Sequence, residues 1–384
     1  MSEINKVESV YRKLTQEGRS IVKIFSGNPA EQGLIFPGEI LKAGYEPYFQ
    51  KMDYAPDPKG DRAARQAIRK YYERHKVNID PEHILLTSGT SESYLHILSV
   101  LTQPGDNILV PHPGYPLFDQ IAAMLHVELR PYQLMEDFQW AVDMDTVLEG
   151  IDDRTRAIFI VSPHNPTGSV MPEAEVCELV DIANERGLAV VSDEVFSEFV
   201  FDGLNFPRVA EVARPELLFT LNGISKMYAL PSMKLSWMAV SGEGRRVASV
   251  VDALETRVDT FLSCHTGIQR TLPLIFSQGG EFLRQYQLEV ERRRNLAVEL
   301  LHPSEAFSFH PPRGGFYMTI KINDTKLSEE DWVIRLMEQE GIFVHPGYFY
   351  DCPGDHLVIS FLTKEEILLP ALEKIFHFVG SSFS

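Results

Sequence analysis

The stretch Gly223–Trp237 places a lysine, Lys226, where amine chemistry could take place. Small or hydroxylated residues surround Lys226, and a second lysine, Lys234, follows eight positions later (234 − 226). Apolar runs on both sides of the stretch are typical of buried strands. We therefore expect Lys226 on a loop at the edge of a sheet. Apolar walls and a second cation would lower its pKa there and favour a Schiff base with a carbonyl. A solvated loop lysine is the alternative.

Three other segments carry polar residues directly after apolar runs. Asp193 ends the run AVVS, where a buried carboxylate is costly unless a cation or a strong donor pairs with it. Asn165 lies in SPHNPTG, whose prolines fix the loop and aim the amide outward. Tyr115 lies between two prolines in PGYP, where its ring could stack on an aromatic ligand or pack in the core.

Two further segments could bind an anion or a polar ligand. Ser88, Gly89 and Thr90 open a predicted helix, whose N-terminal amides and positive dipole end suit a phosphate. An ordinary hydroxyl N-cap is the alternative. Gly27 and Asn28 lie in a Gly/Pro-rich loop and could offer backbone and amide donors, although the sequence of the loop favours a structural turn.

Apolar strands alternate with glycine or proline loops and helices through most of the chain. The expected strands are Ile84–Thr87, Ile108–Val110, Ala157–Val161, Ala189–Ser192, Leu217–Leu221 and Leu235–Val240. This alternation predicts an α/β fold whose large domain has a mostly parallel, doubly wound sheet flanked by helices. Ligands bind such sheets beyond the carboxyl ends of the strands, where the polar residues above are expected.

After about residue 280 the pattern changes to one long helix over residues 281–301, followed by three shorter strands. These strands are Phe316–Ile322, Ile342–His345 and His356–Phe361. We expect a smaller α/β domain built from both chain ends, with a helix in residues 1–25 completing it. The predicted division is an N-terminal segment 1–45, a large cofactor-binding domain 46–282 and a small C-terminal domain 283–384.

Composition excludes several classes of protein. The chain has 384 residues, of which 44% are hydrophobic and 23% charged, as in ordinary globular proteins. A formal net charge of −18 argues against nucleic-acid binding and against anionic membranes. Three cysteines without metal-ligand spacing predict free thiols in a reducing compartment and no metal site. The N-terminal residues lack the apolar core of a signal peptide and no apolar run is long enough to span a membrane, so we expect a cytoplasmic protein.

Taken together, the motifs resemble those of the class I/II aminotransferases, a family of fold-type I enzymes that use pyridoxal 5′-phosphate. The motifs occur in the family's order, as SGT, PGYP, SPHNPTG, SDE and SK, and the resemblance runs from Gly27 to Phe361. It implies an enzyme that moves an amino group between an amino acid and a 2-oxo acid. Members of the family are typically homodimers with shared active sites.

The resemblance also implies roles for individual residues. Lys226 would form the internal aldimine and shuttle the proton during transamination, while Asp193 would keep the cofactor's pyridinium nitrogen protonated. Asn165 would bond the ring oxygen O3′, and Tyr115 would stack on the ring. Tyr54 would reach the phosphate of the partner subunit. The remaining phosphate contacts would come from Ser88, Gly89, Thr90, Ser225 and Lys234.

Three departures from the family pattern concern the cofactor. Phe196 stands where a tyrosine usually donates to O3′, and Gly223 where a phosphate-binding serine is common. Lys234 replaces the usual phosphate-binding arginine, which keeps the charge and loses the planar fork. The Schiff-base lysine, the ring-nitrogen partner and the phosphate cradle remain.

A fourth departure concerns the substrate. Val358 occupies the position of the arginine that binds the substrate's α-carboxylate in the family. A carboxylate in a semi-closed site needs a partner. Arg313 is the candidate replacement, with His356 behind it, although a surface role for Arg313 is equally compatible with the sequence.

Two other functions remain as alternatives to transamination. A pyridoxal-phosphate-dependent lyase or decarboxylase on the same scaffold gains support from the missing arginine. A non-catalytic, aminotransferase-like regulator would need a DNA-binding segment. No basic helix-turn-helix pattern precedes residue 26, and the negative charge disfavours this function.

Overall fold

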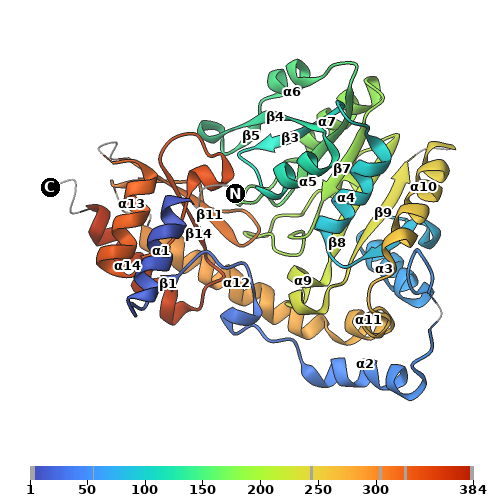
Figure 1. The fold of residues 1–384 in the computed structure, drawn as a ribbon, viewed down its shortest axis with the longest axis horizontal. Helices are drawn as coiled ribbons and strands as arrows, with labels where there is room; N and C mark the ends of the chain where they lie inside the picture. The colour runs from blue at the N-terminus through green and yellow to red at the C-terminus, as the bar shows by residue number, and fades with distance from the viewer. Residues whose placement is uncertain (1–4, 55, 243–244, 302–304, 324–326, 381–384) are drawn as a thin grey trace.

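The computed structural model describes residues 5–54, 56–242, 245–301, 305–323 and 327–380 (Figure 1). A large sheet forms the centre of the molecule, with eight described strands in the order β2-β9-β8-β7-β6-β3-β4-β5. In chain order these strands are β2 Ile84–Thr87, β3 Asn107–His112, β4 Glu128–Met135, β5 Ala141–Val142, β6 Thr155–Val161, β7 Ala189–Asp193, β8 Leu217–Gly223 and β9 Ser236–Gly242. The predicted α/β class is confirmed.

The sheet is mostly parallel, as expected. The pairs β8–β7, β7–β6, β6–β3 and β3–β4 are parallel, whereas β9 runs antiparallel to both β8 and β2. All six predicted strands are present. Strands β4 and β5 are not among the predicted strands, because β4 carries exposed residues and Pro131 in place of a continuous apolar run.

Helices cover both faces of this sheet because its strands alternate their side chains between two apolar cores. On β6, Phe159 packs with α4, α5 and α10, whereas Ile158 and Ile160 pack with α6 and α7 on the other face. Helices α3 and α11 cover the second face at the β2–β9 edge. These helices are α3 Arg62–Arg74, α4 Thr90–Leu101, α5 Leu117–Leu125, α6 Met144–Gly150, α7 Glu173–Glu185, α10 Arg245–Phe261 and α11 Thr266–Gln278.

A second group of elements lies beside the large sheet (Figure 1). It contains a sheet in the order β10-β11-β14-β13 and a parallel pair, β1–β12. Its strands are β1 Val22–Lys23, β10 Phe307–Ser308, β11 Tyr317–Ile322, β12 Ile342–Phe343, β13 His345–Pro346 and β14 His356–Ser360. The predicted strand Ile342–His345 is therefore divided between two sheets. The main helices here are α12 Gly280–Leu301, α13 Glu329–Arg335 and α14 Glu365–Gly380.

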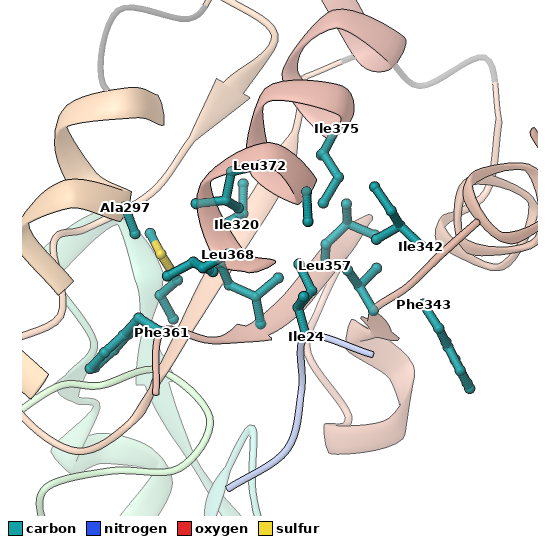
Figure 2. Close-up of a cluster of buried hydrophobic side chains, with 14 of the residues drawn as sticks. Ile24, Ala297, Ile320, Ile342, Phe343, Leu357, Phe361, Leu368, Leu372 and Ile375 are labelled. Atoms are coloured by element: carbon teal, nitrogen blue, oxygen red, sulfur yellow. The ribbon is translucent and has the colours of Figure 1, made fainter. Parts of the chain in front are cut away.

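The core of this second group joins distant parts of the chain. Figure 2 shows Ile24 among Ile342, Leu357 and Leu372, which come from β12, β14 and α14. In Figure 1, α1 (blue) lies beside α13 and α14 (red). Fully buried Val7 on α1 belongs to the same core. Both ends of the described chain thus pack together.

The N-terminal helix is shorter than predicted. Helix α1 spans Lys6–Gln16 in place of residues 1–25, and residues 1–4 of the predicted helix lie outside the described residues. Asn5 caps it by accepting from the Val7 amide. The predicted boundaries at 45/46 and 282/283 fall inside α2 Gly38–Lys51 and α12. No helix of the described residues is both long and apolar enough to cross a membrane.

Candidate active site

A cavity of about 250 Å³ lies beyond the carboxyl ends of the parallel strands. All of the predicted cofactor-binding residues except Tyr54 line it. The lining residues are Ser88, Gly89, Thr90, Ser91, Tyr94, Tyr115, Phe118, Val161, Asn165, Asp193, Val195, Phe196, Gly223, Ser225, Lys226, Lys234, Ser236 and Tyr317. The carboxyl ends of several strands therefore meet at this cavity, as they do in doubly wound sheets.

Lys226 lies on a short helix, α9 Ile224–Met227, directly after β8, and not on a loop as predicted. Its half-buried ammonium group donates a hydrogen bond of 2.6 Å to the Gly27 carbonyl and lies 5.8 Å from the centre of the Phe196 ring. Burial lowers the pKa of Lys226 to about 8. The prediction that a second cation causes this shift is wrong, because desolvation alone accounts for it.

Asp193 is the last residue of β7 and is buried. Strand alternation turns its side chain to the face covered by α4, where Tyr94 Oη donates to one carboxylate oxygen and the Val195 amide to the other, at 3.0 Å. Burial nevertheless raises the pKa of Asp193 to about 6. The next residue, Glu194, points to the opposite face and pairs with buried Arg208 at 2.6 Å.

The N-terminus of α4 opens onto the cavity. Gly89 is its N-cap, and within the described part of the chain no side chain caps the helix, so the hydroxyl N-cap alternative is not what the structure shows. A Cβ placed on Gly89 would meet no described atom within 4 Å, which leaves space for a ligand against the backbone. The Ser88 amide and hydroxyl both donate to Glu92.

The two proline-flanked loops, PGYP and SPHNPTG, contribute Tyr115 and Asn165 to the lining of the cavity. The Oδ1 atom of Asn165 is buried and has no hydrogen-bond partner among the described residues. His164 holds that loop through a 2.8 Å hydrogen bond between its Nδ1 and Thr167 Oγ1. Tyr115 is 43% exposed at the cavity rim, so its ring is available for contact.

Several predicted site residues lie elsewhere. Tyr54 is 80% exposed. Arg313 is exposed and lines other cavities, with Met171 and Pro172, and not the one that contains Lys226. The Asn28 side chain accepts the Ala30 amide in a local turn.

Gly27 contributes to the site in an unexpected way. Its carbonyl oxygen accepts the Lys226 hydrogen bond, whereas the sequence suggested a backbone donor. A Cβ on Gly27 would lie 2.0 Å from Tyr317 Oη and 3.3 Å from Lys226 Nζ. Only glycine therefore fits between these two side chains.

The position expected for a substrate-binding arginine is apolar. Val358 on β14 is fully buried and packs with Tyr350 and Cys352. His356 is also fully buried, and its Nε2 lies 2.9 Å from Glu136 Oε1. Its Nδ1 has no hydrogen-bond partner among the described residues, and His356 does not line the Lys226 cavity, so its role as a carboxylate partner stays a prediction.

Two tyrosines of the cavity, Tyr94 and Tyr317, are not among the predicted site residues. Tyr317 begins β11 directly after the PPRGGF segment, and its hydroxyl lies beside Gly27. Tyr94 follows Thr90 by four positions, one helical turn, so it shares a face with the residue that opens α4. That spacing was the available signal for Tyr94.

The arrangement suits a small anionic ring compound with a reactive carbonyl. A lysine with a pKa near 8 is a competent nucleophile near neutral pH. Asp193 offers a buried carboxylate to a protonated ring nitrogen, and the α4 N-terminus with Lys234 offers an anion site. The lining residues therefore fit a phosphorylated pyridine aldehyde.

Comparisons with known proteins agree with this geometry. Residues 26–375 match the family described as aminotransferase class I and II. Glutamate-pyruvate aminotransferase AlaA of Escherichia coli K12 is 29% identical over 381 residues, which cover 96% of this chain and 93% of that protein. Tyrosine aminotransferase of Caenorhabditis elegans is 26% identical over 360 residues, which cover 92% of this chain and 77% of the relative.

Solved structures show the same fold. Alanine aminotransferase from Pyrococcus furiosus superposes with a TM-score of 0.92 at 24% identity, covering 99% of this chain and 98% of its own. An aminotransferase from Escherichia coli gives 0.90 at 27% identity, covering 98% and 94%. The chain belongs to the class I and II aminotransferase family.

Proposed function

We propose that this aminotransferase binds pyridoxal 5′-phosphate in the Lys226 cavity and exchanges an amino group between an amino acid and a 2-oxo acid. Family members of this fold use this cofactor. The observation that carries the proposal is that Lys226 and Asp193 line one cavity with the uncapped end of α4. The cofactor, when bound, supplies the electron sink that stabilises a carbanion at the substrate's Cα.

Each lining residue then has a defined task. Lys226 binds the cofactor covalently through its ε-amino group and afterwards accepts and returns the Cα proton. Asp193 pairs with the ring nitrogen, Asn165 binds the ring oxygen, and Tyr115 covers the ring. The phosphate is held by Ser88, Gly89, Thr90, Ser225 and Lys234.

Reduction with borohydride tests the covalent role of Lys226. Protein reconstituted with pyridoxal 5′-phosphate, reduced and digested should carry the cofactor on the peptide that contains Lys226. Lys226→Ala should lose the adduct, whereas Lys234→Ala, which removes the other lysine of the cavity, should keep it. An adduct on another lysine in Lys226→Ala would contradict the proposal.

Amino-donor screening tests the reaction itself. Glutamate and pyruvate, named in the Escherichia coli relative, form the first pair to try. Transamination should form alanine and 2-oxoglutarate in equal amounts, and only when both substrates are present. Catalytic release of pyruvate and ammonia from serine, which carries a leaving group on Cβ, in the absence of an acceptor would instead indicate elimination.

The proposal includes a homodimer. Tyr54, exposed by 80%, lies close in sequence to two other exposed apolar side chains, Phe49 (61%) and Met52 (65%), at the end of α2. Apolar surface of this kind favours contact with a second copy. In the dimer Tyr54 would reach the partner's phosphate site. Sedimentation of wild type and of Phe49→Glu tests this, since the added charge should favour the monomer.

The proposal also places the enzyme in the cytoplasm, as the sequence suggested. Cys177, Cys264 and Cys352 are free thiols, which suits a reducing compartment. Detection of the protein in a secreted fraction of its native cells would contradict this location.

A further inference from the structure

Tyr94 makes a contact that neither the proposed transamination nor the family comparison explains. It lies on α4, its side chain is only 2% exposed, and its hydroxyl donates to an Asp193 carboxylate oxygen inside the Lys226 cavity. The Val195 amide donates to the other oxygen. Both oxygens of Asp193 therefore have protein donors.

Packing fixes the direction of this phenol. The Tyr94 ring lies 5.2 Å from the Phe118 ring and 5.8 Å from the Phe159 ring, measured between centroids. Phe159 belongs to β6, next to β7 in the sheet, and Phe118 to α5. Because these two rings restrict the Tyr94 side chain, its hydroxyl stays directed at Asp193, and forming the hydrogen bond costs little further side-chain entropy.

A hydrogen-bond donor to Asp193 affects which group carries the proton when a ring nitrogen is bound to the carboxylate. Hydrogen bonds to the ionised carboxylate stabilise that form and make it a weaker base. A weaker base leaves the proton on the nitrogen. Burial acts in the opposite direction on Asp193, since it disfavours the charge. Tyr94 and the Val195 amide together counter that effect.

Resting on the proposed function, we propose that Tyr94 is a positioning residue that holds Asp193 ionised and so keeps the proton on the cofactor's ring nitrogen. Its hydroxyl touches Asp193 and not the reacting atoms, so it acts through the carboxylate. The other ionisable groups that line this cavity are Tyr115, Tyr317, Lys226 and Lys234. None of these is a hydrogen-bond partner of Asp193 among the described residues.

A purely structural role for Tyr94 needs a matched control. Tyr132 is also a fully buried tyrosine with one hydrogen bond, from its hydroxyl to the Phe159 carbonyl at 2.8 Å. It packs in the core on the opposite face of the sheet. Tyr132→Phe therefore removes an equivalent buried phenol without touching Asp193.

The first test uses the cofactor-free protein. Carboxyl ¹³C NMR of protein labelled at aspartate, with Asp193→Asn to assign the signal, reports the Asp193 titration. Tyr94→Phe should raise the Asp193 pKa by about one pH unit, the effect of losing one hydrogen bond to a charged group. Tyr132→Phe should leave it unchanged. An Asp193 titration in Tyr94→Phe equal to that of wild type overturns the inference. Tyr94→Met provides a second hydroxyl-free variant.

The second test uses the holoenzyme, reconstituted with cofactor labelled with ¹⁵N in the ring. The wild-type signal should be that of a protonated nitrogen, and Tyr94→Phe should move it toward the unprotonated position, while Tyr132→Phe should not. An unmoved signal in Tyr94→Phe overturns the inference and leaves the proposed function standing. A wild-type protein that takes up no cofactor overturns both.

Discussion

Lys226 Nζ and the Gly27 carbonyl oxygen are 2.6 Å apart, although 199 positions separate them in the chain. This hydrogen bond connects α9, the short helix after β8 of the large sheet, with the loop that follows β1. The amine of Lys226 is therefore oriented by the N-terminal segment. Since Tyr317 fills the space on the other side of Gly27, the loop has little freedom to move away.

Gly27→Ala should disturb the site directly. The added methyl group would lie 2.0 Å from Tyr317 Oη, so either the loop or the tyrosine must shift and the Lys226 hydrogen bond must change. We expect slower covalent uptake of pyridoxal 5′-phosphate, followed by absorbance. Gly38→Ala is the control, because its Cβ meets no described atom within 4 Å. Equal uptake rates in both variants would contradict the prediction.

The lowered pKa of Lys226 should appear as a pH-dependent stability. The folded pKa is about 8 against an ordinary 10.5, so between these values the unfolded chain binds a proton that the folded protein lacks. Stability then rises with pH through this window. Relative to Lys226→Met, cofactor-free wild type should be less stable below pH 8 by about 2 kcal/mol, and the gap should narrow toward pH 10.

Urea unfolding at several pH values measures this difference. The control is Lys76→Met, which replaces an exposed lysine of the surface. Its stability relative to wild type should show no such trend. A constant difference between wild type and Lys226→Met from pH 7 to 10 would show that Lys226 is not desolvated.

Lys234 and Arg313 allow a comparison of two exposed cations. Only Lys234 lines the Lys226 cavity. Removal of one charge-assisted contact to a phosphate should weaken binding of pyridoxal 5′-phosphate roughly tenfold in Lys234→Ala. Arg313→Ala should bind the cofactor and the amino donor as wild type does. Equilibrium dialysis and steady-state kinetics measure the two effects, and a raised donor KM in Arg313→Ala would restore its predicted substrate role.

The pair Arg208–Glu194 should matter for stability. Arg208 is buried, 2.6 Å from the fully buried Glu194 carboxylate and 3.1 Å from Glu198. Arg208→Leu leaves both carboxylates without this cation, which should cost about 3 kcal/mol or more in the free energy of unfolding. Arg69→Ala, which breaks an exposed ion pair with Glu73, should cost less than about 1 kcal/mol. Urea unfolding compares the two variants.

Continuous apolar runs explain why much of the large sheet could be predicted. Strands such as β6 and β8 are buried on both faces, so most of their residues are apolar and form runs, AIFIV in β6 and LLF in β8, that stand out in the sequence. The strand β4 lies nearer the edge of the sheet, and only Tyr132 and Leu134 of its residues are buried. Its pattern is therefore mixed, and the sequence analysis missed it.

The site was predictable where residue type and strand ends coincide. Asp193 ends β7, and Lys226 lies on the short helix that directly follows the neighbouring strand β8, so topology brings them together. The contacts of Gly27, Tyr94 and Tyr317 depend instead on how loops and helices pack across the cavity, which no local pattern encodes. Arg313 was chosen for its charge, and only the packing of its loop shows that it lines different cavities.

The pairing of β1 with β12 has a consequence for biosynthesis. Val22 of β1 pairs with Ile342 of β12, so β1 is synthesised about 320 residues (342 − 22) before the strand with which it pairs. Until then, the buried apolar side chains of α1, Val7 and Leu14, lack their final cover, a situation in which nascent chains depend on chaperones. Because Gly27 follows this strand closely, the lysine it orients should reach its final position only near the end of translation.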